Sequence, residues 1–431
     1  MLPSGPPTEG ALYVYSPQVV LGETAVGLDA VVLGGKSKSF ELAWSQVSGP
    51  EGAVIKDAQT RRTQVDGLVA GHYVFRITSR KDGTTLDEKD LVVEVREKPG
   101  GGEVVPCHDP RIRIMGRISA EKPGFYGIGW PGVTLKIRFT GTSLRARLKA
   151  GWGPPAKFMA IIDGKEEQAA IIPLDMRKVV LVCEGLPDGE HSLELVRMDG
   201  AWSGTAEFAG FILDTGARLL EPLPPPQRRI EFYGDSITDG SSMEGYPHNH
   251  PYRAYAMSTA RLLGADVHLV AKGGLGLLKG FALPQTLPTI YDRALPMSSE
   301  TLWDFSKWTP QVVVVNILQN DKWTAKDVPA EDFIRVYRQF LQTLRSRYPR
   351  ALIIAALGSM DAVSEKSPWP VYLKSAVDGY ISSSGDRSVD CFIFPHLAQH
   401  GHPSPVEAAE MARLLADFIQ KKGEIIWNTN L

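Results

Sequence analysis

Cysteine is scarce in this chain. Three cysteines occur among 431 residues, and they are widely spaced: Cys107, Cys183 and Cys391. An odd, scattered set forms neither the disulfide framework of a small secreted domain nor the paired spacing of a zinc site. We therefore expect no disulfide. Hydrophobic residues make up 43% of the chain, and the length suggests roughly two to four domains, each large enough to bury a core.

An excess of either charge is also missing. The formal net charge is −2, from 47 basic and 49 acidic residues. This balance gives no general attraction to nucleic acid or to acidic membranes. No window of about 18 apolar residues occurs, so no membrane-spanning helix is predicted. We expect neither nucleic acid nor a membrane among the partners.

A signal peptide is absent as well. Residues 1–7 lack the basic region and the apolar core of such a peptide. They are typical of the cut edge of a longer chain, from which we expect a secretion signal to have been removed. The predicted location is therefore secreted, periplasmic or at the cell surface.

Two composition breaks divide the chain. Residues 97–102 are glycine-rich and predict a flexible hinge, and residues 222–226 are proline-rich and predict a stiff spacer. We expect three domains, at residues 1–98, 104–222 and 228–431.

The first two domains have the pattern of β-proteins. In the first, strand-like runs at 73–78 and 91–95 flank a turn signal at 81–84. In the second, short strand-like runs recur, and the pairs Asp163-Gly164 and Asp188-Gly189 predict hairpins. Many short strands with glycine and proline turns favour a sandwich or jelly roll in the second domain.

The third domain has an alternating α/β pattern. Continuous apolar runs at 312–316, 352–356 and 391–394 are typical of a parallel sheet that is buried on both faces. Between them, residues 330–348 have helical spacing with core residues Phe333, Ile334, Tyr337, Phe340, Leu341 and Leu344. Residues 407–420 predict a closing helix. The fold class is therefore α/β, with helices flanking a parallel sheet.

The most informative segment is residues 230–240, in which an apolar strand ends in Gly-Asp-Ser. Ser236 is thereby placed where a strand ends and a helix begins, at the carboxyl edge of the sheet, where open α/β folds bind ligands. His402 follows 166 residues later, just before the closing helix. A serine needs a base to act as a nucleophile, and these two residues are a candidate pair.

Two further segments offer hydrogen-bond donors. Gly274, in a glycine-rich stretch after a strand, can point its N–H at a ligand. Asn320, after the run at 312–316, can donate from its amide. Acyl transfer needs such donors where the carbonyl oxygen becomes negative. Each segment alone is equally compatible with an ordinary turn.

Ser236, Gly274, Asn320 and His402 stand in the order of the four sequence blocks of the SGNH (GDSL) hydrolases, and the chain resembles that superfamily. The stretches 291–296, 303–308 and 228–232 resemble carbohydrate esterase family 2, which also places a jelly roll before the SGNH domain. This resemblance covers residues 105–425. Segments 43–50 and 67–75 resemble polycystic-kidney-disease (PKD) domains of the immunoglobulin-like class, a sandwich with Trp44 in its core. That domain is either a sugar-binding module or a spacer, and we favour a spacer.

The resemblance to family 2 implies a function. Its members remove acetyl groups from polysaccharides such as xylan and mannan, without metal or cofactor. Carried over, Ser236 attacks the acetyl carbonyl and His402 moves the proton. The oxyanion is held by the backbone N–H groups of Ser236 and Gly274 and by the Asn320 side chain.

Two positions depart from the superfamily pattern. Leu318 stands where the third block usually has glycine. Leucine is bulkier and less permissive, so we expect the loop that carries Asn320 to sit differently. Gln399 stands where many members have an aspartate, three residues before the histidine. We therefore expect a Ser–His dyad whose imidazole is oriented by a backbone carbonyl, with a carboxylate such as Glu407 as the alternative.

Other residues are candidates for substrate contact, namely Trp323, Asp235 and His250. His248 and His250 alone make no metal site. Trp303 and Trp308 are expected in the core. Two other functions stay open: a lipid or aryl esterase, although no long apolar lid segment occurs, and a carbohydrate-binding protein without catalysis. The sequence does not indicate an oligomeric state.

Overall fold

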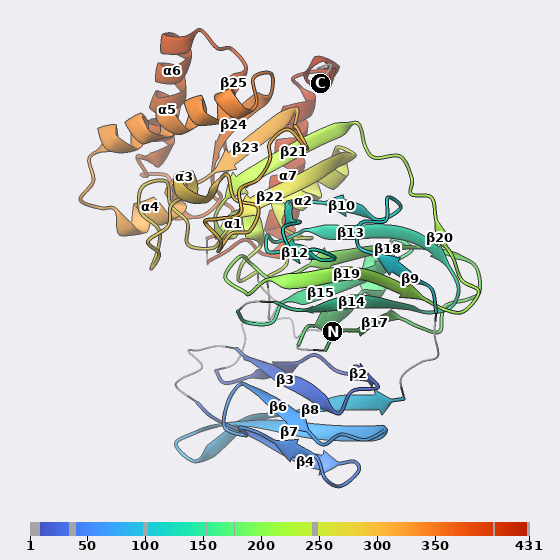
Figure 1. Cartoon of the computed structure of the whole chain (residues 1–431). Coiled ribbons are helices and arrows are strands. Elements are labelled where there is room, and N and C mark those ends of the chain that lie inside the picture. The colour runs from blue at the N-terminus through green and yellow to red at the C-terminus, as the bar shows by residue number, and fades with distance from the viewer. Residues whose placement is uncertain are drawn as a thin grey trace.

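The structure is a computed structural model that describes residues 9–33, 40–97, 102–151, 153–175, 177–243, 249–399 and 401–428. Three domains follow one another along the chain (Figure 1). Most of the predicted hinge at 97–102 lies outside the described residues. All three cysteines are free in the structure. Within the described ranges, no helix has the length and apolar character needed to cross a membrane.

The N-terminal domain is the predicted β-sandwich. Its two sheets have the orders β1-β3-β6-β5 and β2-β8-β7-β4. The strands are β1 (Leu12–Val14), β2 (Gln18–Leu21), β3 (Ala25–Val32), β4 (Glu41–Ser48), β5 (Val54–Ile55), β6 (Arg62–Asp66), β7 (Gly71–Lys81) and β8 (Thr84–Arg96). Trp44 lies in its core, 3% exposed, and the predicted turn joins β7 to β8.

The middle domain is strand-rich, as expected, and is called the jelly-roll domain below. Its sheets have the orders β10-β13-β18-β15-β16 and β11-β12-β19-β14-β17, with β20 and β9 at their margins. The strands are β9 (Val104–Pro106), β10 (Arg113–Met115), β11 (Ile118–Ser119), β12 (Tyr126–Ile128), β13 (Thr134–Thr140), β14 (Leu144–Ala150), β15 (Lys157–Ile162), β16 (Ala170–Pro173), β17 (Val180–Cys183), β18 (Glu190–Arg197), β19 (Ala206–Leu213) and β20 (Leu219–Leu220), with a 3₁₀ turn η2 (Glu166–Gln168).

One of the two predicted hairpins is wrong. Asp163-Gly164 follows β15, which pairs with the next strand, β16, as expected. Asp188-Gly189 instead lies between β17 and β18, which belong to different sheets. The Asp-Gly signal reports a change of chain direction, and it does not report which strands pair afterwards.

The C-terminal domain contains a five-stranded parallel sheet of order β22-β21-β23-β24-β25. Its strands are β21 (Arg228–Gly234), β22 (Ala265–Ala271), β23 (Val312–Asn316), β24 (Leu352–Leu357) and β25 (Val389–Ile393). The helices are α1 (Ser236–Asp239), α2 (Tyr255–Leu262), α3 (Leu287–Ile290), α4 (Gln319–Thr324), α5 (Ala330–Arg347), α6 (Trp369–Ser384) and α7 (Pro405–Gln420), with 3₁₀ turns η3 (Asp361–Val363) and η4 (Glu424–Ile426).

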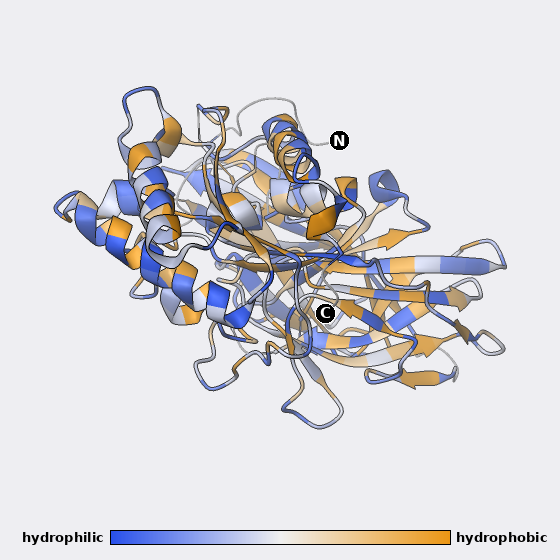
Figure 2. Ribbon diagram, turned by 90° about the horizontal axis from the view of Figure 1, so that it is seen from above, coloured by the Kyte–Doolittle hydropathy of each residue, from blue (hydrophilic) through white to orange (hydrophobic). Residues whose placement is uncertain are grey.

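Helices cover both faces of this sheet. Side chains of one strand face, including Phe232 and Val314, pack with α2 and α7. The alternate side chains, including Tyr233 and Val315, pack with α5 and α6. The strands are continuously apolar because neither face meets water, as predicted. The helices alternate between hydrophobic and hydrophilic residues along their length, which is typical of elements that bury one side (Figure 2).

The jelly-roll and C-terminal domains share a buried ion pair. Arg117 and Glu231 are both fully buried, and Nη2 of Arg117 lies 2.8 Å from Oε1 of Glu231. Arg117 also donates to the carbonyl oxygen of Tyr291 at 2.6 Å, and Glu231 accepts from the hydroxyls of Tyr233 and Tyr348. These contacts join the two domains and fix the jelly roll close to the sheet.

Candidate active site

Three neighbouring strands end at the same level. Gly234, at the end of β21, is in register with Ala271 of β22 and with Asn316 of β23. Ser236, Gly274 and Asn320 follow these strand ends within a few residues. Parallel register therefore brings the three predicted site segments to one edge of the sheet, the carboxyl edge.

Ser236 is the first residue of α1, at a tight strand-to-helix turn as the sequence predicts. The preceding Asp235 caps the helix, because its Oδ1 accepts the N–H of Ile237 at 3.0 Å. Gly234 has no room for a side chain, since a Cβ there would collide with Thr238. Ser236 is 7% exposed, and its hydroxyl makes no hydrogen bond with any described residue, the predicted partner His402 included.

The Gly274 loop is held by its neighbours. Gly274 has φ +82°, a backbone conformation that favours glycine. Its N–H has no acceptor among the described residues, whereas the N–H of Gly273 donates to Asp239 at 2.8 Å. Lys272 N–H donates to the carbonyl oxygen of Gly234 at 3.2 Å. The loop is thereby fixed against the Ser236 turn and leaves one amide unused.

Asn320 connects the three segments. Its Nδ2 donates to the carbonyl oxygen of Leu275 at 2.8 Å and, more weakly, to Oδ2 of Asp235 at 3.3 Å. The next residue, Asp321, accepts from the backbone N–H groups of residues 277, 278 and 279 at 2.6–3.0 Å. One Asn320 hydrogen is well bound, and the other has a long bond that a stronger acceptor can replace.

Leu318 adopts a backbone conformation that favours glycine. Its φ is +94°, in the left-handed region, and its side chain is 1% exposed within the core. The backbone before α4 therefore has the glycine-type bend, and a buried leucine side chain accommodates it.

His402 comes from the loop between β25 and α7. A small buried cluster of Met243, Ala254 and Ala408 joins the start of α7 to the segment that follows α1. Nε2 of His402 is buried and has no hydrogen-bond partner among the described residues. Burial lowers the pKa of His402 below its usual 6.5, so the imidazole is neutral at pH 7 and able to accept a proton.

Glu407 is engaged elsewhere. Its Oε2 accepts the N–H of Ser404 at 2.7 Å, and Oγ of Ser404 accepts the N–H of Glu407 at 3.4 Å. This is a capping box at the start of α7. The carboxylate therefore caps a helix, and the alternative that it orients His402 has no support in the structure.

Three family models match successive parts of the chain. They are a PKD domain at residues 16–95, the carbohydrate esterase 2 N-terminal domain at 114–225, and the GDSL-like lipase/acylhydrolase family at 232–409. The solved structure of a family two carbohydrate esterase from Clostridium thermocellum, in complex with cellohexaose, is 30% identical with a TM-score of 0.67. That match covers 73% of this chain and 99% of the other. This chain belongs to the family 2 carbohydrate esterases.

Two curated relatives are also similar to this family member. Cellulase/esterase CelE of Acetivibrio thermocellus is 32% identical over 336 residues, which are 73% of this chain and 40% of CelE. The chain therefore spans two fifths of the length of CelE. An acetylxylan esterase / glucomannan deacetylase of Cellvibrio japonicus is 27% identical over 337 residues, which are 74% of this chain and 90% of the relative.

The predicted substrate contacts of this family 2 esterase differ in exposure. Trp323 is 37% exposed, and its Nε1 donates to Asp361 at 3.1 Å. Asp235 and His250 are 1% and 5% exposed, so they lie beneath the surface. His248 lies outside the described residues.

Trp303 and Trp308, which the sequence predicts in the core, pack against a buried histidine, His268. Trp308 stacks on His268 with ring centroids 3.6 Å apart, and Trp303 meets the same ring edge to face at 5.5 Å. Both are half-buried, so they pack at the margin of the core and not within it as expected.

Sequence reasoning missed Asp239, Asp321 and Trp202. Asp239 and Asp321 lie in the same sequence motifs as Ser236 and Asn320, so their positions in the sequence could have marked them as candidate site residues. Trp202 belongs to the jelly-roll domain, in the β18–β19 loop, and its indole N–H donates to the carbonyl oxygen of Gly273 at 2.7 Å. No pattern in the sequence connects it with this edge of the sheet.

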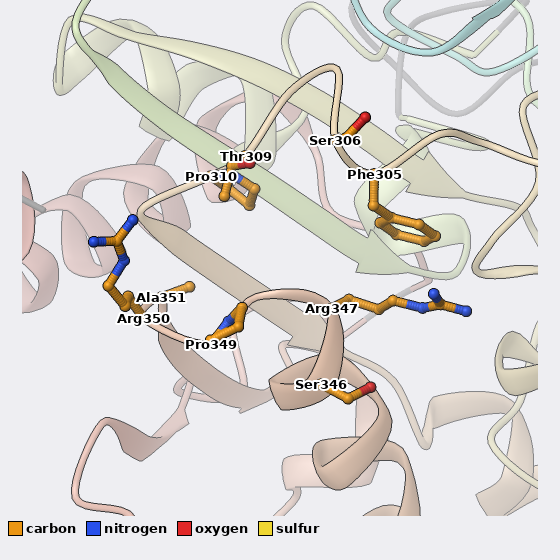
Figure 3. Close-up of a pocket in the computed structure, with 9 residues that line it drawn as sticks. All are labelled: Phe305, Ser306, Thr309, Pro310, Ser346, Arg347, Pro349, Arg350 and Ala351. Carbon is orange, nitrogen blue, oxygen red and sulfur yellow. The ribbon is translucent and has the colours of Figure 1, made fainter. Parts of the chain in front are cut away.

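A separate pocket of about 420 Å³ opens at the other end of the sheet (Figure 3). It is lined by Phe305, Ser306, Thr309, Pro310, Ser346, Arg347, Pro349, Arg350 and Ala351. Pro310 and Ala351 precede β23 and β24, so the pocket is at their amino ends. In Figure 3 the Arg347 and Arg350 side chains extend to opposite sides, and no predicted site residue contributes. This pocket is not part of the candidate active site.

Proposed function

We propose that this chain is a serine esterase that removes O-acetyl groups from a polysaccharide such as xylan or mannan. The observation that carries the proposal is the junction of Ser236, Gly274 and Asn320 at the carboxyl edge of the sheet, linked by hydrogen bonds between their segments. The names of the relatives point to the same substrate class. A polysaccharide is met outside the cytoplasm, so the proposal includes export.

In the first step, Oγ of Ser236 attacks the acetyl carbonyl while Nε2 of His402 takes its proton. The carbonyl oxygen becomes an oxyanion that accepts from the N–H groups of Ser236 and Gly274 and from Nδ2 of Asn320. Both amides have no acceptor among the described residues. The oxyanion replaces Asp235 as the acceptor for the second Asn320 hydrogen. The tetrahedral intermediate then expels the sugar oxygen, which takes the proton from His402.

In the second step, water attacks the acetyl group on Ser236. His402 removes a proton from that water, the same donors hold the second oxyanion, and the proton returns to Oγ as acetic acid leaves, which then ionises in solution. Atoms and charge balance with groups of the chain and water alone.

We further propose that His402 works in a dyad. No ion pair with a carboxylate is found for it in the described ranges, and Glu407 is occupied by the helix cap. The structure shows no hydrogen bond of His402 to any described residue, so a backbone carbonyl as the group that fixes the imidazole tautomer is part of the proposal and rests on the family resemblance.

The test is hydrolysis of 4-nitrophenyl acetate, butyrate and octanoate by the wild type and Ser236→Ala. We expect fast acetate turnover that declines with acyl length and is lost in Ser236→Ala. Ser306→Ala, in the pocket at the opposite end of the sheet, is the matched control and should retain wild-type rates. Acetate release from acetylated xylan and acetylated mannan then identifies the polymer.

Each other outcome has a clear meaning. Equal rates for wild type and Ser236→Ala, or no turnover of any ester, would contradict the proposal and favour a carbohydrate-binding protein. Faster octanoate than acetate turnover would instead indicate a lipid or aryl esterase.

A further inference from the structure

Exposed aromatic rings gather at one place in the described part of the chain. The tryptophan and phenylalanine side chains that stand out as exposed there are Trp202 at 48%, Phe281 at 55% and Trp323 at 37%. The N–H of Phe281 donates to the carbonyl oxygen of Gly274 at 2.7 Å. The rings of Phe281 and Trp323 meet edge to face with centroids 6.3 Å apart. Three separate elements thus bring exposed rings to the Gly274 loop.

Trp202 is the member of this group that comes from the jelly-roll domain. The residues that precede it in the β18–β19 loop, such as Ala201, are buried, so the loop is well anchored. The indole N–H is bound to Gly273, and Nζ of Lys272 lies 4.5 Å from the ring centroid. A Cβ placed on Gly274 would be 3.7 Å from the ring. The ring is therefore fixed directly beside the candidate oxyanion hole.

A fixed and exposed tryptophan is suited to binding. Its polar N–H already has a partner within the protein, so the surface that remains free is apolar. Its rotamer is already ordered, so a ligand that covers it loses little further side-chain entropy. Apolar surface left in this state is typical of an interaction site.

The chemistry of the patch favours a sugar ring over an acyl chain. A pyranose has apolar C–H faces and a polar rim, so it can lie on an aromatic ring while its hydroxyls stay hydrated. An acyl chain has no polar rim and needs nearly complete burial. A half-exposed ring such as that of Trp202 can support the face of a sugar, but it cannot bury an acyl chain.

We propose that Trp202 binds a sugar ring of the substrate chain beside the ring that bears the acetyl group. This inference rests on the proposed esterase function. It makes the jelly-roll domain a direct contributor to substrate specificity, through one side chain of the β18–β19 loop.

The test compares two acetate esters, one formed by a sugar chain and one formed by ethanol, and it compares each variant with the wild type on the same ester. Kinetics of Trp202→Ala and Trp202→Phe are measured on acetylated xylo-oligosaccharides or gluco-oligosaccharides and on ethyl acetate, which has no ring to stack. For Trp202→Ala we expect kcat/KM to fall at least tenfold more on the acetylated oligosaccharide than on ethyl acetate. Trp202→Phe, which keeps a ring but lacks the N–H, should recover part of the oligosaccharide loss.

A binding measurement separates recognition from catalysis. In the Ser236→Ala background, calorimetry with unacetylated cellohexaose and xylohexaose should show a weaker Kd when Trp202→Ala is added. Ile425→Ala, an exposed apolar residue of η4, is the control and should bind like the parent.

Two results would overturn the inference. Equal falls on both esters would show that Trp202 only supports the Gly273 loop. An ethyl octanoate rate that depends on Trp202 more than the oligosaccharide rate would assign the patch to an acyl chain. Failure of the proposed function itself would give a different result: no ester would be hydrolysed in a way that depends on Ser236.

Discussion

The carboxylate of Asp239 accepts a hydrogen bond from the backbone N–H of Gly273 at 2.8 Å. Its other oxygen accepts from the N–H of Ser241 at 2.8 Å and from the Ser241 hydroxyl. Asp239 ends the helix that begins with Ser236, and Gly273 precedes Gly274. One fully buried carboxylate therefore fixes the distance between the candidate nucleophile and a candidate oxyanion donor.

We predict that Asp239→Asn lowers kcat about tenfold with little change in KM. An amide has a single acceptor oxygen, so either Gly273 or Ser241 loses its bond. A hydrogen bond to a charged group contributes about 1.5–3 kcal/mol, and 1.4 kcal/mol is tenfold in rate. Steady-state kinetics on ethyl acetate at pH 8, where Asp239 is charged, measure the effect. Asp304→Asn is the matched control, because Asp304 accepts the same two bonds from Ser306 at the surface. A KM effect alone would contradict this role.

The same carboxylate should make stability depend on pH. Burial raises the pKa of Asp239 to about 7 from its ordinary 3.8, although hydrogen bonds from Ser241 and Gly273 lower it. The folded state therefore holds this proton more tightly than the unfolded state. Its stabilising contribution is fully present below pH 3.8 and is lost as the pH rises through about 7.

Urea unfolding of wild type and Asp239→Asn at intervals from pH 4 to 8 checks this. The wild type should lose stability relative to the variant by up to about 1.4 kcal/mol per pH unit between the two pKa values. Parallel curves for the two proteins would show that Asp239 does not titrate in this range.

The pH dependence of catalysis should report His402. Burial lowers its pKa from 6.5, and only the neutral imidazole can take the proton of Ser236. We predict that kcat/KM for ethyl acetate falls on the acid side with a midpoint below pH 6.5. An acid limb at or above pH 6.5 would indicate a carboxylate partner that stabilises the charged imidazole, in place of a dyad.

The buried ion pair between the domains should be costly to break from one side only. Arg117→Met leaves the fully buried Glu231 without its charge partner and should destabilise the protein by about 3–5 kcal/mol. Adding Glu231→Gln removes the orphaned charge, so the double variant should be more stable than Arg117→Met alone. Urea unfolding of the wild type, Arg117→Met, Glu231→Gln and the double variant measures the coupling, and additive losses would contradict it.

Local signals predicted much of this molecule. The strand-to-helix turn at Ser236, the buried strands and the helical core positions of α5 depend on sequence neighbours, so they are readable from the chain. The cap formed by Ser404 and Glu407 was also readable, since it has the spacing of a capping box. Contacts between domains were not. Trp202 reaches Gly273 across about seventy residues, and Arg117 reaches Glu231 across more than one hundred. In neither pair does the sequence around one residue indicate which distant residue it contacts.

Leu318 offers a test in which two effects oppose each other. Its φ of +94° is strained for any residue with a Cβ, and glycine would relieve about 1–2 kcal/mol. Its buried side chain contributes more, because removing a core leucine costs about 2–5 kcal/mol. We therefore predict that Leu318→Gly is destabilised overall.

The informative comparison is with Leu318→Ala, which loses the same packing and keeps the strain. At an ordinary helix position glycine is about 1 kcal/mol less stable than alanine. Here the order should reverse, with Leu318→Gly more stable than Leu318→Ala in urea unfolding. Alanine more stable than glycine would mean that the backbone before Asn320 does not hold the left-handed conformation. If the order does reverse, a buried leucine side chain stabilises a backbone bend that by itself favours glycine.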